Sequence, residues 1–124
     1  MKKLLTIVYL TKNNPNQLLE TLNSVLNYKL IIENSKILII NGSYEKYYKD
    51  YENIYLYFKR IYFLNFINEK KKGIYISMNK AIRNIDSEFI LFMNSGDIFS
   101  HELDEKLLIK NLLLFKTDKK VKLI

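Results

Sequence analysis

Hydrophobic and polar residues alternate in blocks along the chain, and the blocks predict strands separated by helices. Residues 5–10 form a continuous apolar run rich in β-branched side chains, which is typical of a buried strand. The polar cluster 11–15 follows as a predicted loop, where Asn14 caps a helix and Pro15 takes its first position. Helical spacing then relates the apolar residues Leu18, Leu19, Leu22, Val25 and Leu26.

The same alternation continues through most of the chain. Apolar runs predict further strands over residues 36–40, 61–66 and 89–93. The last of these runs is the most apolar, so we expect it to be buried on both faces at the centre of the sheet. Three further helices are predicted by the stripes Tyr44, Tyr47, Tyr48, Tyr51 and Tyr55; Ile74, Met78, Ala81, Ile82 and Ile85; and Leu103, Leu107, Leu108, Leu112 and Phe115.

Strands that alternate with helices imply right-handed crossovers and a mainly parallel sheet. We therefore predict a single α/β domain over residues 1–124, built as a three-layer α/β/α sandwich. The absence of cysteine excludes disulfides, thiolate nucleophiles and Cys-ligated zinc. No run approaches the roughly 18 apolar residues of a membrane span, and the apolar start is interpreted as a strand rather than a signal peptide.

The chain is basic, with 20 Lys and Arg against 13 Asp and Glu and a net charge of +7. This charge permits an anionic partner without identifying one. Tyrosines interleaved with lysines over residues 44–55 can stack nucleic-acid bases, but at this spacing they are more often a helix face packed on a sheet. No nucleic-acid-binding motif is present, so a nucleic-acid partner is not expected.

Ligands of parallel sheets bind beyond the carboxyl ends of the strands. Three polar loops are expected there, at residues 11–14, 41–43 and 94–97. Asp97 follows a buried strand, which would hold its carboxylate rigidly. A divalent cation bound to a nucleotide diphosphate needs only one or two protein carboxylates, so Asp97 with Asn94 beside it is a candidate site. That Asp97 only caps a turn is the equally weighted alternative.

Two stretches carry a resemblance to a known family. Residues 69–82, with the segment Gly-Ile-Tyr-Ile-Ser-Met-Asn-Lys-Ala-Ile, and residues 88–97, ending in Asn-Ser-Gly-Asp, resemble the family 2 glycosyltransferases. Thr11 after the first strand, Thr21 in the first helix and the strand end 41–43 complete the ordered set. The resemblance implies the A-type, Rossmann-like fold of nucleotide-diphospho-sugar transferases. It also implies inverting, metal-dependent transfer of a sugar from a nucleotide sugar, by expectation a UDP-sugar, to a polysaccharide or lipid-linked acceptor in cell-surface glycan biosynthesis.

The resemblance also assigns roles to residues. It implies that Asp97 binds Mn²⁺ or Mg²⁺ next to the diphosphate. The residues implied to bind the nucleotide sugar are Thr11, Asn41, Gly42, Ser43, Gly73, Asn79, Asn94, Ser95 and Asp97.

The chain departs from the family pattern at several places. Relatives carry an aspartate at the end of the second strand, where it meets the uracil ring, and here Ile40 and Asn41 occupy the candidate positions. Relatives also have acids where Lys71 and Ile76 stand. The resemblance implies that the acceptor-binding second half and its carboxylate base lie outside these 124 residues, so no catalytic base is assigned. The acids at 102, 104 and 105 are interpreted as charges that complement the dipole of the last helix.

These departures leave two functions open. The first is a glycosyltransferase, or its donor-binding half, located in the cytoplasm and in contact with the inner face of a membrane. A homodimer or a partner chain would then supply the missing half. The second is a non-catalytic remnant that acts as a nucleotide-binding or protein-interaction module.

Overall fold

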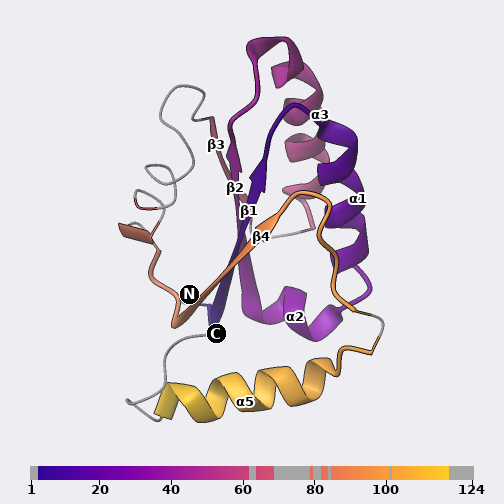
Figure 1. Cartoon of the computed structure of the whole chain (residues 1–124). Helices are drawn as coiled ribbons and strands as arrows, with labels where there is room; N and C mark the ends of the chain where they lie inside the picture. Colours follow the sequence, from indigo (N-terminus) through magenta and orange to yellow (C-terminus); the bar gives the residue numbers. More distant parts are fainter. Residues whose placement is uncertain are drawn as a thin grey trace.

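The computed structural model of the protein describes residues 3–61, 64–68, 79, 82–83, 85–100 and 102–117. Within them the chain has an α/β fold with four parallel strands in the order β3-β2-β1-β4. Figure 1 shows α1 and α3 against one face of the sheet and α5 crossing beneath it beside α2. The elements are β1 (Leu5–Thr11), α1 (Pro15–Val25), α2 (Lys29–Asn34), β2 (Ser35–Asn41), the 3₁₀ turn η1 (Glu45–Tyr47), α3 (Tyr48–Phe58), β3 (Leu64–Asn68), β4 (Phe89–Asn94) and α5 (Glu105–Thr117).

The two central strands, β1 and β2, are buried on both faces. Their side chains alternate between two apolar clusters, as the two-residue period of a strand requires. Ile7 and Ile39 belong to the cluster covered by the helices, and Val8 and Leu38 belong to the cluster on the opposite face. The helices add fully buried side chains to the first cluster, including Leu18, Leu22, Ile31, Tyr51 and Phe58. The predicted parallel sheet with helices packed on it is therefore confirmed.

In the part of the chain that the structure describes, the fourth strand lies at the edge of the sheet rather than at its predicted centre. Within the described residues β4 pairs with β1 alone and stands at the edge. Phe89 is buried, whereas residues 90–93 are half-buried. A continuous apolar run indicates that both faces of a strand are partly covered, but it carries no information about which strands lie beside it.

The first helix forms as the sequence predicts. The Asn14 side chain caps α1 by accepting a hydrogen bond of 3.2 Å from the Gln17 N–H, and Pro15 occupies the first helical position. Leu19 and Leu26 lie at the margin of the apolar stripe, where each is 37% exposed. The side chains buried beneath the helix are Leu18, Thr21, Leu22 and Val25.

The tyrosine-rich stretch forms η1 and α3, and most of its predicted stripe packs on the sheet. Tyr51 is completely buried, and Tyr47 and Tyr55 are half-buried against the same cluster. Tyr44 precedes η1 and is 57% exposed. The interpretation of the stripe as a helix face packed on a sheet is therefore confirmed for its central members.

The second helical layer was predicted over residues 74–85, and most of it lies outside the described residues. Ile85 packs against the cluster that contains Val8, on the face of the sheet opposite α1 and α3. Ile82 is helical but 43% exposed, so its predicted place in the buried stripe is wrong. Of the two described members of the predicted stripe, Ile85 packs on the sheet and Ile82 is exposed.

Two boundaries in the second half also differ from prediction. β3 begins at Leu64 rather than Ile61, because the chain leaves α3 through a turn in which the Ile61 N–H donates to the Phe58 carbonyl at 2.9 Å. In α5, Leu112 is buried as predicted, but Leu107 is 52% exposed. No helix in the described part of the chain is long and apolar enough to cross a membrane.

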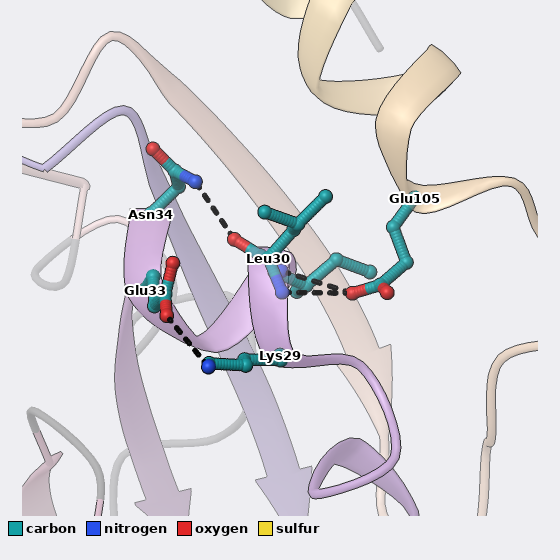
Figure 2. A network of polar contacts seen from close by, with 6 residues as sticks. Lys29, Leu30, Glu33, Asn34 and Glu105 are labelled. Atoms are coloured by element: carbon teal, nitrogen blue, oxygen red, sulfur yellow. Dashed lines mark hydrogen bonds and ion pairs between the residues drawn. The ribbon is translucent and has the colours of Figure 1, made fainter.

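The short helix α2 was not predicted, because six residues are too few to show a helical period. Its start is held by a side chain from the other end of the chain (Figure 2). Glu105 Oε1 accepts hydrogen bonds from the N–H groups of Leu30 at 2.9 Å and Ile31 at 3.3 Å. Glu105 therefore caps α2 as well as adding charge to the first turn of α5, while Asp104 Oδ1 caps α5 through the Leu107 N–H at 3.1 Å. The interpretation of these acids as surface charge alone is corrected.

We expect Glu105→Ala to lower the free energy of unfolding by about 1–2 kcal/mol, because two backbone N–H groups of α2 lose their acceptor. Urea unfolding followed by circular dichroism measures the change. Glu102→Ala is the matched control, since Glu102 is an exposed glutamate three residues earlier. Equal effects of the two substitutions would show that charge, rather than capping, matters at this position.

Candidate functional site

Three polar loops lie together at the carboxyl edge of the sheet, as predicted. The register sets this meeting, because Thr11 at the end of β1 lies opposite Asn41 at the end of β2. On the other side of β1, Leu10 lies opposite Asn94 at the end of β4. The loops that follow β1, β2 and β4 therefore leave the sheet at one level, where ligands of parallel sheets bind.

The loops after β1 and β2 are joined to each other by backbone and side-chain hydrogen bonds. The Gly42 N–H donates to the Thr11 carbonyl at 2.9 Å, and the Asn13 N–H donates to Ser43 Oγ at 2.6 Å. The Tyr44 N–H donates to Asn13 Oδ1 at 2.9 Å. Asn13 has a φ of 53°, a conformation that asparagine tolerates better than most residues. The two loops therefore form one unit.

Tyr51 ties this unit to α3. Its hydroxyl lies 2.8 Å from Thr11 Oγ1 and accepts the Asn14 N–H at 3.1 Å. Thr11 itself is 4% exposed, so its side chain is positioned within the protein rather than in solvent. Sequence reasoning assigned Tyr51 to the core and missed this contact. Helical spacing predicts that the Tyr51 side chain faces the sheet, but it does not predict which groups its hydroxyl contacts.

Asn41 and Ser43 are also built into the protein, and both are completely buried. Asn41 Oδ1 accepts the Ser43 N–H at 3.0 Å, and Asn41 Nδ2 donates to Asn68 Oδ1 at 2.9 Å. This side-chain turn reverses the chain after β2. Gly42 is therefore not required for a left-handed turn, and within the described residues Gly96 is the glycine with a positive φ.

The third loop is a tight turn anchored to β1 and α1. The Ser95 N–H donates to the Leu10 carbonyl at 2.7 Å, and the Gly96 N–H donates to the buried Thr21 Oγ1 at 2.7 Å. The Asp97 N–H closes the turn on the Asn94 carbonyl at 3.0 Å, and Gly96 at its third position has a φ of 97°. A positive φ at this position is the requirement of a type II turn.

Two polar atoms of this loop lack a hydrogen-bond partner among the described residues. Ser95 Oγ is buried and has no hydrogen-bond partner within the described residues. Asp97 is exposed, and its Oδ2 accepts the Asn94 N–H at 2.9 Å. Its other oxygen, Oδ1, makes no hydrogen bond to a described residue. Asp97 therefore closes a turn and keeps one carboxylate oxygen available.

Of the remaining predicted residues, the structure describes Asn79 alone. Gly73, Lys71 and Ile76 lie outside the described residues, and Asn79 is helical and exposed. The part of the chain that the structure describes contains no group of three His, Cys, Asp or Glu side chains able to hold a metal. A cation at Asp97 would accordingly need most of its ligands from a bound molecule and water, which is how Mg²⁺ binds with nucleotide phosphates.

Two surface hollows lie apart from the carboxyl-edge loops. One of about 400 Å³ is lined by Thr6, Lys36 and Asp86 near the opposite edge of the sheet, together with side chains of β2 and β3. The other, of about 380 Å³, lies between Pro15 and Asp50 on the outer side of α1 and α3. Neither includes the cluster residues Thr11, Ser95 or Asp97. Strand topology and chemistry, rather than hollow volume, identify the candidate site.

A parallel sheet with polar loops at its carboxyl edge defines the class of open α/β folds that bind ligands at that edge. Comparison with protein families narrows this class, because the model of glycosyl transferase family 2 matches residues 6–110. The chain therefore belongs to that family, and the predicted membership is confirmed. A comparison with curated proteins found no match.

Solved structures share the fold at low sequence identity. The mannosyltransferase PcManGT from Pyrobaculum calidifontis, in complex with GDP-Man and Mn²⁺, is similar over 98% of this chain and 34% of its own, with a TM-score of 0.71 and 14% identity. TarS from S. aureus matches over 95% of this chain and 20% of its own, with a TM-score of 0.66 and 19% identity. TarS 1-349 from S. aureus, in complex with UDP-GlcNAc, is similar over 93% of this chain and 31% of its own, with a TM-score of 0.67 and 18% identity. The chain thus spans about a fifth to a third of the length of these proteins.

The geometry of the third loop generates a stability prediction. We expect Gly96→Ala to lower the free energy of unfolding by about 1–2 kcal/mol, because a Cβ is disfavoured at a positive φ. The new Cβ itself would have room, since its nearest neighbour would be the Gln17 side chain at 3.5 Å. Chemical denaturation measures the loss.

Gly42→Ala is the control for this prediction. A Cβ at Gly42 would meet only the Thr11 carbonyl oxygen, at 3.9 Å, and no positive φ is involved. We expect this variant to unfold within about 0.5 kcal/mol of the unmodified protein. A Gly42→Ala variant that is less stable than Gly96→Ala would contradict the assignment of the conformational requirement to the third loop.

Proposed function

We propose that this chain is the donor-binding part of an inverting glycosyltransferase that binds a nucleotide diphosphate sugar, with UDP as the expected nucleotide. The observation that carries the proposal is the third loop, where an exposed carboxylate oxygen of Asp97 and the buried hydroxyl of Ser95 lack partners within the described residues. A buried hydroxyl without a partner costs about 1–3 kcal/mol, and a ligand or a water would relieve that cost. Family membership supports the choice of a nucleotide sugar.

The residues present fit Mn²⁺ or Mg²⁺ only when a diphosphate is bound. Asp97 would supply one oxygen ligand and Asn94 stands beside it, while phosphates and water would supply the rest. A cation held there would stabilise the negative charge that develops on the departing diphosphate. The mannosyltransferase with GDP-Man and Mn²⁺ supports this as an analogy of fold.

The transfer that we propose is a single displacement. The acceptor hydroxyl oxygen forms a bond to the anomeric carbon, the bond from that carbon to the diphosphate oxygen breaks, and its electron pair leaves with the nucleotide diphosphate. The hydroxyl proton passes to a carboxylate base, for which no described residue is assigned. We further propose a polysaccharide or lipid-linked acceptor at the inner face of a membrane, supported by the family resemblance alone.

The loops after β1 and β2 have a different part in the proposal. The side chains of Thr11, Asn41 and Ser43 are engaged within the protein, so we assign them to shaping the nucleotide pocket. A specific observation also favours the second function, a nucleotide-binding module without catalysis. The family's base-reading acid is replaced, and the Asn41 amide is bonded at both its oxygen and its nitrogen.

We expect calorimetric titration with UDP to show binding that requires Mn²⁺ and that weakens at least about tenfold in Asp97→Ala, because a charged ligand to the metal is lost. Asp50→Ala is the matched control, since it removes an exposed aspartate on α3. Equal affinities of the two variants would remove Asp97 from the metal site. Metal-dependent binding without any sugar transfer or UDP-sugar hydrolysis, alone or with a partner chain, would favour the non-catalytic module.

A further inference from the structure

Tyr51 combines complete burial with a polar group whose bonds run to one loop. Its ring lies in the apolar cluster between the helices and the sheet, and the whole side chain is buried. A buried phenol is retained at such a place when its oxygen has partners, because an unpaired hydroxyl is costly. Within the described residues, both hydrogen-bond partners of this oxygen, Thr11 and Asn14, border or belong to the loop between β1 and α1.

The two contacts hold the loop at its start and at its end. The Asn14 N–H can only donate, so the phenol oxygen accepts that hydrogen bond at 3.1 Å. The second contact joins the phenol to Thr11 Oγ1 at 2.8 Å, where either oxygen can donate. One rigid ring, fixed in the core, thereby sets the separation of Thr11 from Asn14.

The segment between these contacts needs such support. Asn13 has a φ of 53°, and non-glycine residues keep this conformation where surrounding contacts over-determine it. Asn13 is also the residue through which the first loop bonds Ser43 and Tyr44 of the second loop. A displacement of Asn13 in the first loop would therefore disturb the hydrogen bonds that hold the second loop.

We propose that Tyr51 is a positioning residue for nucleotide binding: its hydroxyl fixes the loop at residues 11–14, and through Asn13 the loop after β2, without itself contacting the nucleotide. This inference rests on the proposed function for the identity of the ligand. The alternative is that Tyr51 serves only to fill the core. The two differ in what removal of the hydroxyl does to the ligand affinity of the folded protein.

The chain offers a matched control on the same helix. Tyr51 and Tyr55 lie one turn apart on α3, and each ring centroid lies 6.1 Å from that of Phe66, at interplanar angles of 47° and 44°. The Tyr55 hydroxyl makes no hydrogen bond within the described residues. Tyr51→Phe and Tyr55→Phe therefore remove the same atom from two rings that share Phe66 as a neighbour, one ring buried and the other half-buried, but only the first removes contacts to the loop.

The test compares these two variants in two measurements below their unfolding temperatures. We expect Tyr51→Phe to weaken Mn²⁺-dependent UDP binding about threefold to tenfold, the change for one lost hydrogen bond, and Tyr55→Phe to leave it unchanged. In the free protein, we expect backbone amide exchange measured by NMR to accelerate at Asn13 and Asn14 in Tyr51→Phe only.

Each outcome decides the inference. Unchanged UDP affinity in Tyr51→Phe overturns it, even if that variant is less stable. Equal weakening in both variants also overturns it, because the effect would then follow from core packing. If the unmodified protein binds no UDP, the proposed function fails, and the exchange measurement still decides: unchanged protection of Asn14 in Tyr51→Phe overturns the positioning role, whereas its selective loss supports that role for another ligand.

Discussion

The carboxyl end of β1 is the constraint on which the site depends. This strand is hydrogen-bonded on both edges, and its last two residues also bond the residues that directly follow β4 and β2. The Leu10 carbonyl receives the Ser95 N–H from one neighbour, and the Thr11 carbonyl receives the Gly42 N–H from the other. Since β1 and β2 are apolar on both faces, a slip of one residue would move buried side chains to the wrong cluster. The register that buries the core thus also brings the three loops together.

The three loops differ in whether side chains or backbone groups make their hydrogen bonds. The first two loops use their side chains to hold one another and α3, which leaves Asn41 and Ser43 buried and bonded. The third loop is held mainly through backbone N–H groups, which leaves the buried Ser95 hydroxyl and one oxygen of the exposed Asp97 without partners in the described residues. Side chains that are already bonded can shape a pocket but have little capacity to bind a ligand directly. The exposed Asp97 of the third loop is therefore the better candidate for direct contact.

The asparagine at position 41 has a structural explanation that is independent of any ligand. Its oxygen accepts from Ser43 while its nitrogen donates to Asn68, so it links the end of β2 to both the following turn and β3. A carboxylate could accept the first hydrogen bond but could not donate the second. The Asn41 amide thus holds the end of β2, the following turn and β3 together.

The sequence by itself determined the α/β class, most strand and helix positions and the gathering of three polar loops at one edge. These features follow from local periodicity, from capping residues such as Asn14 and from the general behaviour of parallel strands. Tertiary structure alone decided the pairing of β4 with β1, the capping of α2 by Glu105 and the contact of Tyr51 with the first loop. Each of these joins residues far apart in the chain, and a periodic pattern identifies the face on which a side chain lies but not the atom that its end will meet.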